Sequence, residues 1–105
     1  MFGLVVRFEL RDAESAERFD RLVAETGEGI KAYEPGTLVY ATHRVQDAPL
    51  SRVFYEIYRD RAAFEEHERQ PHTVRFLSGR SEFIESVRVE FIEPITTKGI
   101  ADNDR

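Results

Sequence analysis

The sequence contains no cysteine and no tryptophan, and its single methionine is the first residue. The absence of cysteine excludes disulfides, thiolate nucleophiles, iron–sulfur clusters and zinc sites built on thiolates. Long apolar runs are also absent. The N-terminal run meets a charge at Arg7, too early for a signal peptide, and no run approaches the roughly 20 apolar residues of a membrane span. We therefore expect a cytoplasmic protein with no membrane partner.

Basic residues are too few and too scattered for a nucleic-acid surface. The chain has 15 basic and 20 acidic residues, which gives a formal net charge of −5. Because phosphate contacts need clustered Lys and Arg, we expect no nucleic-acid partner. Gly27 and Gly29 lack the third glycine of a dinucleotide-binding loop, and no Gly-x-Ser-x-Gly motif occurs. Nucleotide cofactors and serine hydrolysis therefore have no support.

The composition that remains is typical of one small folded domain. A length of 105 residues, 41% of them hydrophobic, is enough for one core and too short for two. We expect this domain to span residues 1–94. The polar segment 95–105 is expected to be loose unless a partner holds it.

Hydrophobic periodicity predicts the element order β-α-β-β-α-β. Strands are expected over residues 3–10, 37–45, 52–59 and 87–91, and a first helix over residues 13–31. The second helical region is expected as two pieces, which begin after Asp60 and at Pro71. The second of these pieces should carry Val74, Leu77 and Ile84 on its apolar face, which Phe76 and Phe83 widen. The order is that of the ferredoxin-like split unit, an α+β fold with a four-stranded antiparallel sheet whose first and third strands are neighbours.

The third predicted strand carries large apolar side chains on both of its faces. Val53, Tyr55 and Ile57 alternate with Phe54 and Tyr58. In such a sheet the two helices cover one face only, and the other face needs a second cover. We therefore expect a homodimer in which two sheets pack face to face.

The densest group of reactive side chains lies between Phe54 and Phe76. It contains Glu56, Tyr58, His67 and His72. Histidine moves protons near neutral pH, and a nearby carboxylate raises its basicity. This combination favours general acid–base chemistry beside an aromatic-walled pocket.

Structural roles remain open for each of these residues. Glu56 could form an ion pair with Arg7, His67 could stabilise the end of its helix, His72 could lie on the surface, and Tyr58 could belong to the core. His43 is expected at the surface or at an interface. Nothing in the spacing demands that two histidines and a glutamate converge on a metal ion, so we expect no metal site.

Four segments occur in a characteristic order and spacing: residues 34–40, 52–60, 63–67 and 70–72. In them the chain resembles the antibiotic biosynthesis monooxygenase family of small dimeric α+β barrel proteins, and the similarity extends from the first strand to about Phe91. The resemblance implies an oxygenase that needs no flavin, haem or metal and that oxidises quinols or polycyclic phenols with O2. Other members of that family degrade haem, isomerise or process a signalling sugar, or have no known activity.

The resemblance also implies a site between the sheet and the helices. Phe54, Glu56 and Tyr58 would enter it from the third strand, Phe64, His67 and His72 from the helices, and Arg7 would lie on its floor. His67 or His72 would be the base, Glu56 its orienting partner, and Arg7 the stabiliser of an oxyanion. Phe54, Tyr58 and Phe64 would hold the substrate.

Two departures from the family pattern narrow the chemistry. Leu77 stands where the haem-degrading members have their axial histidine, and the chain lacks the tryptophan of that pocket. Tyr58 stands where some polyketide-tailoring members have tryptophan. We therefore expect a cofactor-independent monooxygenase that acts on a small phenolic, quinol or polycyclic aromatic substrate. An isomerase or lyase, or a non-catalytic ligand-binding protein of the same fold, remains as an alternative.

Overall fold

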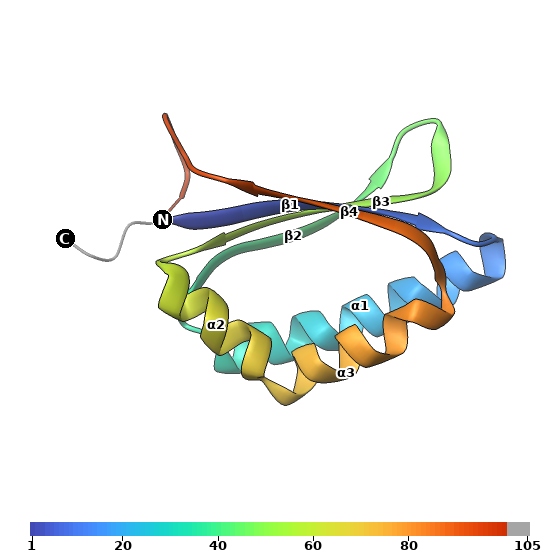
Figure 1. Cartoon of the computed structure of the whole chain (residues 1–105), viewed down its shortest axis with the longest axis horizontal. Helices are drawn as coiled ribbons and strands as arrows, with labels where there is room; N and C mark the ends of the chain where they lie inside the picture. The colour runs from blue at the N-terminus through green and yellow to red at the C-terminus, as the bar shows by residue number, and fades with distance from the viewer. Residues whose placement is uncertain (101–105) are drawn as a thin grey trace.

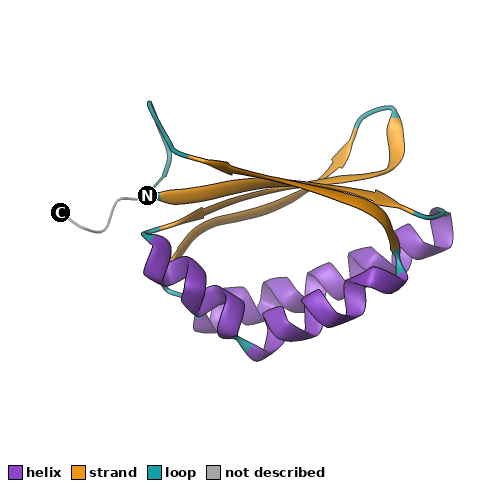
Figure 2. Ribbon diagram, in the orientation of Figure 1, coloured by secondary structure: helices purple, strands orange, loops and turns teal. Residues whose placement is uncertain are grey.

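The computed structural model describes residues 1–100 and consists of a four-stranded sheet with all of its helices on one side (Figures 1 and 2). The elements follow in this order: β1 (Phe2–Leu10), α1 (Ala13–Tyr33), β2 (Thr37–Val45), β3 (Ala48–Tyr58), α2 (Arg61–Arg69), α3 (Pro71–Gly79), a short 3-10 turn (Arg80–Glu82) and β4 (Ile84–Ile92). This architecture confirms the predicted ferredoxin-like α+β fold.

The sheet has the strand order β2-β3-β1-β4, and every neighbouring pair is antiparallel. The first and third strands are therefore neighbours, as predicted. Leu4 of β1 lies opposite Glu56 of β3, and Val6 lies opposite Phe54. Because side chains alternate between the faces of a sheet, these even-numbered residues all point toward the helices.

The core fills the space between the sheet and the helices with aromatic rings. Leu4, Val6, Phe8 and Leu10 form one buried row along β1. The ring of Phe8 lies 4.8 Å from that of Phe54 and contacts rings on α1 and α3 as well. Such ring pairs add to the large area that each aromatic side chain buries.

The helices α1 and α2 begin directly after their predicted N-cap residues, Asp12 and Asp60. The Asp12 carboxylate accepts a hydrogen bond from the Ser15 N–H at 2.7 Å, and the Asp60 carboxylate accepts one from the Ala63 N–H at 2.8 Å. Pro71 occupies the first turn of α3, where its missing N–H has no helical partner to lose. These signals fixed the starts of all three helices.

The predicted buried face of α3 was correct for Phe76 and wrong for Val74 and Ile84. Thr73 and Phe76 are buried, whereas Val74 is 53% exposed and Ile84 belongs to β4. The large ring of Phe76 enters the aromatic core, and this fixes the rotation of the helix about its axis. The 3-10 turn after Gly79 then ends the helical period before Ile84 is reached.

Within residues 1–100 no helix covers the opposite face of the sheet. In Figure 1 the β2–β3 hairpin and the segment after β4 both rise on this side, away from the helices. Residues 95–100 form neither helix nor strand, and the remainder of the predicted tail, residues 101–105, lies outside the described residues. The helix-covered face is therefore where a buried site can form.

Candidate active site

A cavity of about 170 Å³ lies between the sheet and the helices. An engineered apolar cavity of roughly 150 Å³ holds one benzene molecule, so this volume suits a single aromatic ring. β1 lines it with Leu4, Val6 and Phe8, while Phe54, Phe64 and Phe76 supply aromatic walls. Polar groups reach it at only a few points.

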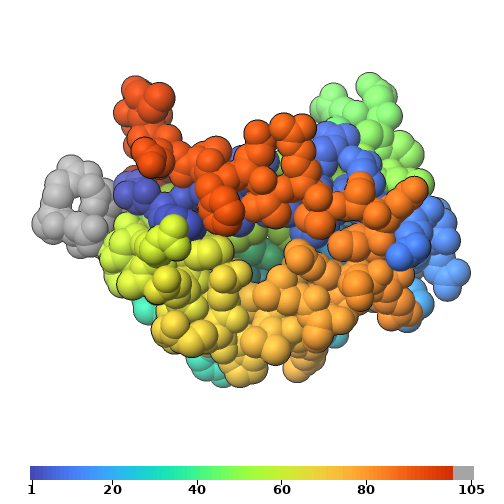
Figure 3. Space-filling model, viewed as in Figure 1, coloured from blue at the N-terminus to red at the C-terminus, as the bar shows by residue number. Residues whose placement is uncertain are grey.

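The cavity opens toward the edge strand β4. Figure 3 shows a hollow between β4 and the helices α2 and α3. Val89 and Phe91 of β4 and Leu77 of α3 line the cavity and remain 45%, 63% and 38% exposed. These apolar side chains therefore form the rim through which a small aromatic molecule would enter.

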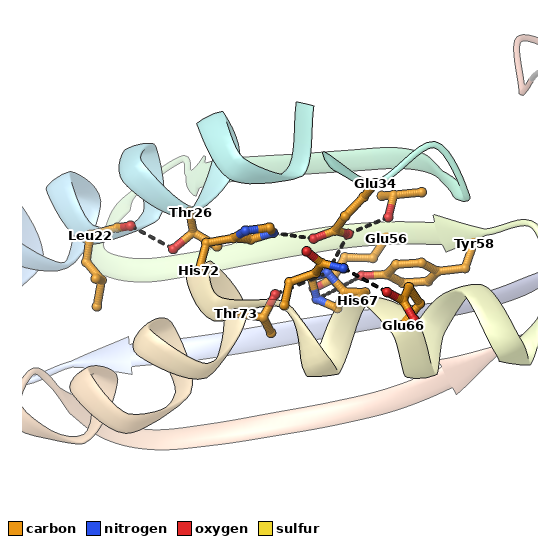
Figure 4. A network of polar contacts seen from close by, with 11 residues as sticks. Leu22, Thr26, Glu34, Glu56, Tyr58, Glu66, His67, His72 and Thr73 are labelled. Carbon is orange, nitrogen blue, oxygen red and sulfur yellow. Dashed lines mark hydrogen bonds and ion pairs between the residues drawn. The ribbon is translucent and has the colours of Figure 1, made fainter. Parts of the chain in front are cut away.

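Glu34 is the centre of the polar network in Figure 4. Its carboxylate accepts hydrogen bonds from His67 Nδ1 at 2.8 Å, from the Thr37 hydroxyl at 2.7 Å and from His72 Nε2. The side chain is only 2% exposed. Glu34 follows the last residue of α1, and Pro35 after it ends the helix, so the carboxylate is held where α1 passes into β2.

The hydrogen bonds keep Glu34 ionised. Burial alone would raise the pKa of this carboxyl, but the donors on His67, Thr37 and His72 outweigh burial and hold the pKa below its ordinary value. An ionised Glu34 accepts the Nδ1 proton of His67. The other ring nitrogen, Nε2, is then left with a free lone pair when the ring is neutral.

Glu56 faces the second nitrogen of His67. Its Oε1 lies 4.0 Å from His67 Nε2 and accepts a hydrogen bond from the Tyr58 hydroxyl at 2.5 Å. Burial raises the pKa of Glu56, and the Tyr58 hydrogen bond and the nearby His67 offset only part of that effect. Burial also raises the pKa of Tyr58 and of Tyr40, so both phenols remain neutral. The cavity is thus lined by two groups that can transfer protons, the imidazole of His67 and the carboxyl group of Glu56.

His72 meets the same carboxylate from the first turn of α3 but does not line the cavity. Its ring packs directly on α1, where a Cβ at Gly29 would lie 2.4 Å from the ring. The two histidines therefore converge on Glu34, while only His67 reaches the cavity. Gly29 is what allows His72 to approach.

Gly29→Ala and Gly27→Ala should change stability in opposite directions. Alanine inside a helix is favoured over glycine by roughly 0.5–1 kcal/mol. A Cβ at Gly27 meets nothing within 4 Å, so Gly27→Ala should gain about that amount. Gly29→Ala should instead lose stability, because the new methyl displaces the His72 ring. Urea unfolding of the two variants checks this, and a Gly29→Ala protein as stable as Gly27→Ala would contradict it.

Comparison with known proteins assigns the chain to a family. The family profile described as Antibiotic biosynthesis monooxygenase matches residues 1–78, from the first residue into α3. The chain belongs to the antibiotic biosynthesis monooxygenase family. A search of curated protein sequences found no match.

Solved structures share the fold of this family member over most of its length. A protein of Mycobacterium tuberculosis is 28% identical with a TM-score of 0.73, and the alignment covers 91% of this chain and 96% of that one. A protein of Pseudomonas aeruginosa is 26% identical with a TM-score of 0.73, over 90% of this chain and 94% of that one. A third structure, named antibiotic biosynthesis monooxygenase, has a TM-score of 0.81 at 23% identity and covers 91% of this chain and 100% of its own; at that identity it shows the fold alone.

Four of the predicted site residues of this family member line the cavity, whereas Tyr58, His72 and Arg7 do not. Phe54, Glu56, Phe64 and His67 line the cavity, and Tyr58 stands behind Glu56. The prediction that Arg7 lies on the floor was wrong. Arg7 projects from the opposite face of the sheet, where it bonds Glu9 at 2.7 Å and Ser51 at 3.1 Å, because it lies one residue out of phase with the buried row of β1.

His43 is also remote from the cavity. It is exposed on β2, and its Nδ1 lies 3.1 Å from the Val53 carbonyl oxygen. Glu56 and Arg7 do not form the ion pair that was one alternative, since Glu56 points toward the helices. His43 therefore provides a histidine that serves as a control for variants at His67.

Several polar residues at the site were not predicted from the sequence. They include Thr37 and Glu34 of the polar network and Tyr40, Thr73 and Arg80 around the cavity. Thr73 Oγ1 lies 3.5 Å from His67 Nδ1, and Tyr40 lies directly opposite Glu56 in the sheet. The spacing of residues 73, 76 and 80 places them on one helical face, and that signal could have found Arg80 once Phe76 was assigned to the core.

Among residues 1–100, no three or more His, Asp or Glu side chains are arranged to hold a metal ion. Over the same residues, no helix combines the length and apolar character that a membrane crossing needs.

Proposed function

We propose that this protein is a monooxygenase that needs no cofactor and oxidises a small phenol or quinol with O2. One observation carries the proposal: the Nδ1 of His67 is anchored on the buried carboxylate of Glu34, and its Nε2 lies 4.0 Å from Glu56 Oε1 beside a cavity with aromatic walls that both residues line. The membership of the antibiotic biosynthesis monooxygenase family supports the reaction type.

The reaction begins with removal of a phenolic proton. His67 Nε2 accepts the proton, and Glu34 stabilises the imidazolium that results, as carboxylates do in other acid–base pairs. The phenolate is electron-rich and passes electrons to O2. For a quinol, addition of O2 gives a hydroxyquinone and one water, so the substrate supplies all four electrons that the reduction of O2 requires.

Glu56 and Tyr58 acquire roles that differ from the expected ones, whereas Phe54 and Phe64 keep theirs. Glu34 rather than Glu56 orients His67. Glu56, whose pKa is raised by burial, lines the cavity as the second proton-transfer group. Phe54 and Phe64 hold the ring of the substrate, and Tyr58 positions Glu56 through its hydroxyl.

A second candidate function is isomerisation or elimination without oxygen. The observation that favours it is the presence of two proton-transfer groups, His67 and Glu56, 4.0 Å apart in one cavity. Such a pair can remove a proton at one carbon and return it at another. Dependence of product formation on oxygen separates this candidate from the oxygenase.

We further propose that the protein is a homodimer. The sheet face away from the helices presents Val5, Val53 and Tyr55, which are only partly buried, between the raised hairpin and the segment after β4. A second copy packed sheet on sheet would cover them. Sedimentation equilibrium should give twice the 12.2 kDa chain mass, and a monomer at micromolar concentration would contradict the proposal.

Oxygen uptake tests the proposed activity. The purified protein is mixed with a panel of quinols and catechols in an oxygen electrode, and the uncatalysed oxidation of each compound is subtracted. We expect uptake above background and incorporation of one atom from ¹⁸O2 into the product. Product that forms equally under nitrogen would favour the isomerase or lyase, and binding without any product would favour a ligand-binding protein.

A further inference from the structure

Arg80 is a partly buried cation at one end of the cavity. It caps the C-terminal end of α3 and lines the cavity beside Phe8 and Phe76. Its guanidinium carbon lies 5.8 Å from the Phe8 ring centre and 5.9 Å from that of Phe76. The two rings hold the cation in place through its π contacts.

No carboxylate within residues 1–100 pairs with Arg80. No Asp or Glu oxygen in this part of the chain lies within 4.0 Å of its guanidinium, and its side chain donates no hydrogen bond there. Arg52, which is fully buried, is different: it bonds both oxygens of Asp20, at 2.8 and 3.0 Å, and two backbone carbonyls. Partial burial lowers the pKa of Arg80, and the exposed Glu68 at the rim only partly offsets this. The fork of five N–H donors on Arg80 is thus accessible from the cavity and has no acidic partner among residues 1–100.

The cavity is polar at its two ends and apolar between them. Leu4, Val6 and Phe8 form its floor along β1. Glu56 is paired with Leu4, whereas Arg80 lies over Phe8, four residues further along the strand. At roughly 3.3 Å per residue, the two ends are separated by about 13 Å of strand. His67, the proposed proton acceptor, lies beside Glu56 at one end, and the guanidinium of Arg80 lies at the other.

We propose that the substrate is an aromatic hydroxyl compound that carries a carboxylate, with the carboxylate bound by Arg80 and the hydroxyl facing His67. The inference rests on the proposed function for the role of the hydroxyl. A guanidinium binds a carboxylate through two parallel hydrogen bonds, and a neutral substrate would leave this partly buried cation without a charged partner. Arg80 lies outside residues 1–78, the segment that the family profile matches. The match to the family therefore does not include this residue.

Binding of two matched ligands under nitrogen tests the proposal. The probes are 3,4-dihydroxybenzoate and 3,4-dihydroxybenzamide, which share their shape and differ in charge. Calorimetry should show that the wild-type protein binds the acid at least tenfold more tightly than the amide. In Arg80→Met the preference should fall to about one, with the affinity for the amide changed by less than about threefold.

Arg75→Met is the matched control. Arg75 lies on the same helix, is 71% exposed and pairs with Glu25, so its loss removes the same charge without touching the cavity. This variant should keep the tenfold preference. Arg80→Lys retains the positive charge but lacks the planar guanidinium, so it should keep part of the preference for the acid. If Arg80→Met does not fold, Arg80→Lys replaces it in the comparison.

The outcomes separate this proposal from the oxygenase. Equal affinities in the wild type, no binding of either probe, or a preference that persists in Arg80→Met would each overturn the role of Arg80. Oxygen uptake with catechol but no preference for the acid would overturn that role alone and leave the oxygenase standing. A preference that depends on Arg80, without oxygen uptake from any bound catechol, would support the carboxylate site and overturn the oxygenase.

Discussion

Replacing His67 with alanine is expected to lower the rate constant of oxygen uptake by about 10²–10⁴, the usual contribution of one general base. The reason is that His67 is the histidine that lines the cavity, while His72 donates to Glu34 from outside it. The KM should change little, because the aromatic walls on Phe54 and Phe64 remain. The rate is measured with an oxygen electrode on the best substrate of the quinol and catechol panel.

Two other histidines provide the controls. His43→Ala should keep the wild-type rate, since His43 is exposed on β2 away from the cavity. His72→Ala should reduce the rate less than His67→Ala and should shift its pH profile, because His72 acts on the base through the shared Glu34 carboxylate. Added imidazole should restore part of the activity of His67→Ala. Full uptake by His67→Ala would remove the base from the mechanism and with it the central observation of the proposed function.

The fold could be predicted because local signals agree along most of the chain. Alternation in β1, the caps at Asp12 and Asp60, and the break at Pro35 set the elements to within a few residues of their observed bounds. The exception was α3. Apolar side chains occur on more than one side of this nine-residue helix, so periodicity alone could not decide which side is buried. The packing of Phe76 among the rings of the core decided it.

The site could be predicted only in part, and the error at Arg7 shows why. If Leu4, Val6 and Phe8 face the helices, then Arg7 must face away, and the sequence itself carried that information. The expectation from family resemblance overrode this alternation. Cavity residues such as Glu56 and His67 were predicted correctly because the periodicity of their strand or helix showed which face they occupy.

Glu34 was missed for a different reason. It stands directly before a proline at the end of a helix, where a glutamate is usually exposed, and no periodic pattern extends across that junction. Its burial comes from three donors on separate segments: Thr37, His67 and His72. Long-range convergence of this kind is set by tertiary packing and has no local signature.

Glu34 should also dominate the pH dependence of stability. At pH 7, Glu34→Gln is expected to lower the free energy of unfolding by about 3 kcal/mol, because removing one partner of a buried charged network leaves the others without compensation. The pKa of Glu34 is lowered in the folded protein from an ordinary value of 4.5. Its stabilising contribution is therefore complete above the ordinary pKa and is lost as the pH falls through the lower, folded pKa.

The difference between wild type and Glu34→Gln should accordingly narrow between pH 7 and pH 3, as the wild-type carboxyl takes up its proton. Urea unfolding at both pH values and at one protein concentration measures it. Glu66→Gln is the matched control: its carboxylate is 57% exposed and pairs with Arg69, so its loss should change stability by less than about 1 kcal/mol. A Glu34→Gln protein as stable as the wild type at pH 7, or a difference that widens in acid, would mean that the carboxylate does not hold the two histidines in its ionised form. The imidazolium at His67 would then lack its counter-charge, and the proton acceptor of the proposed reaction would have to be Glu56.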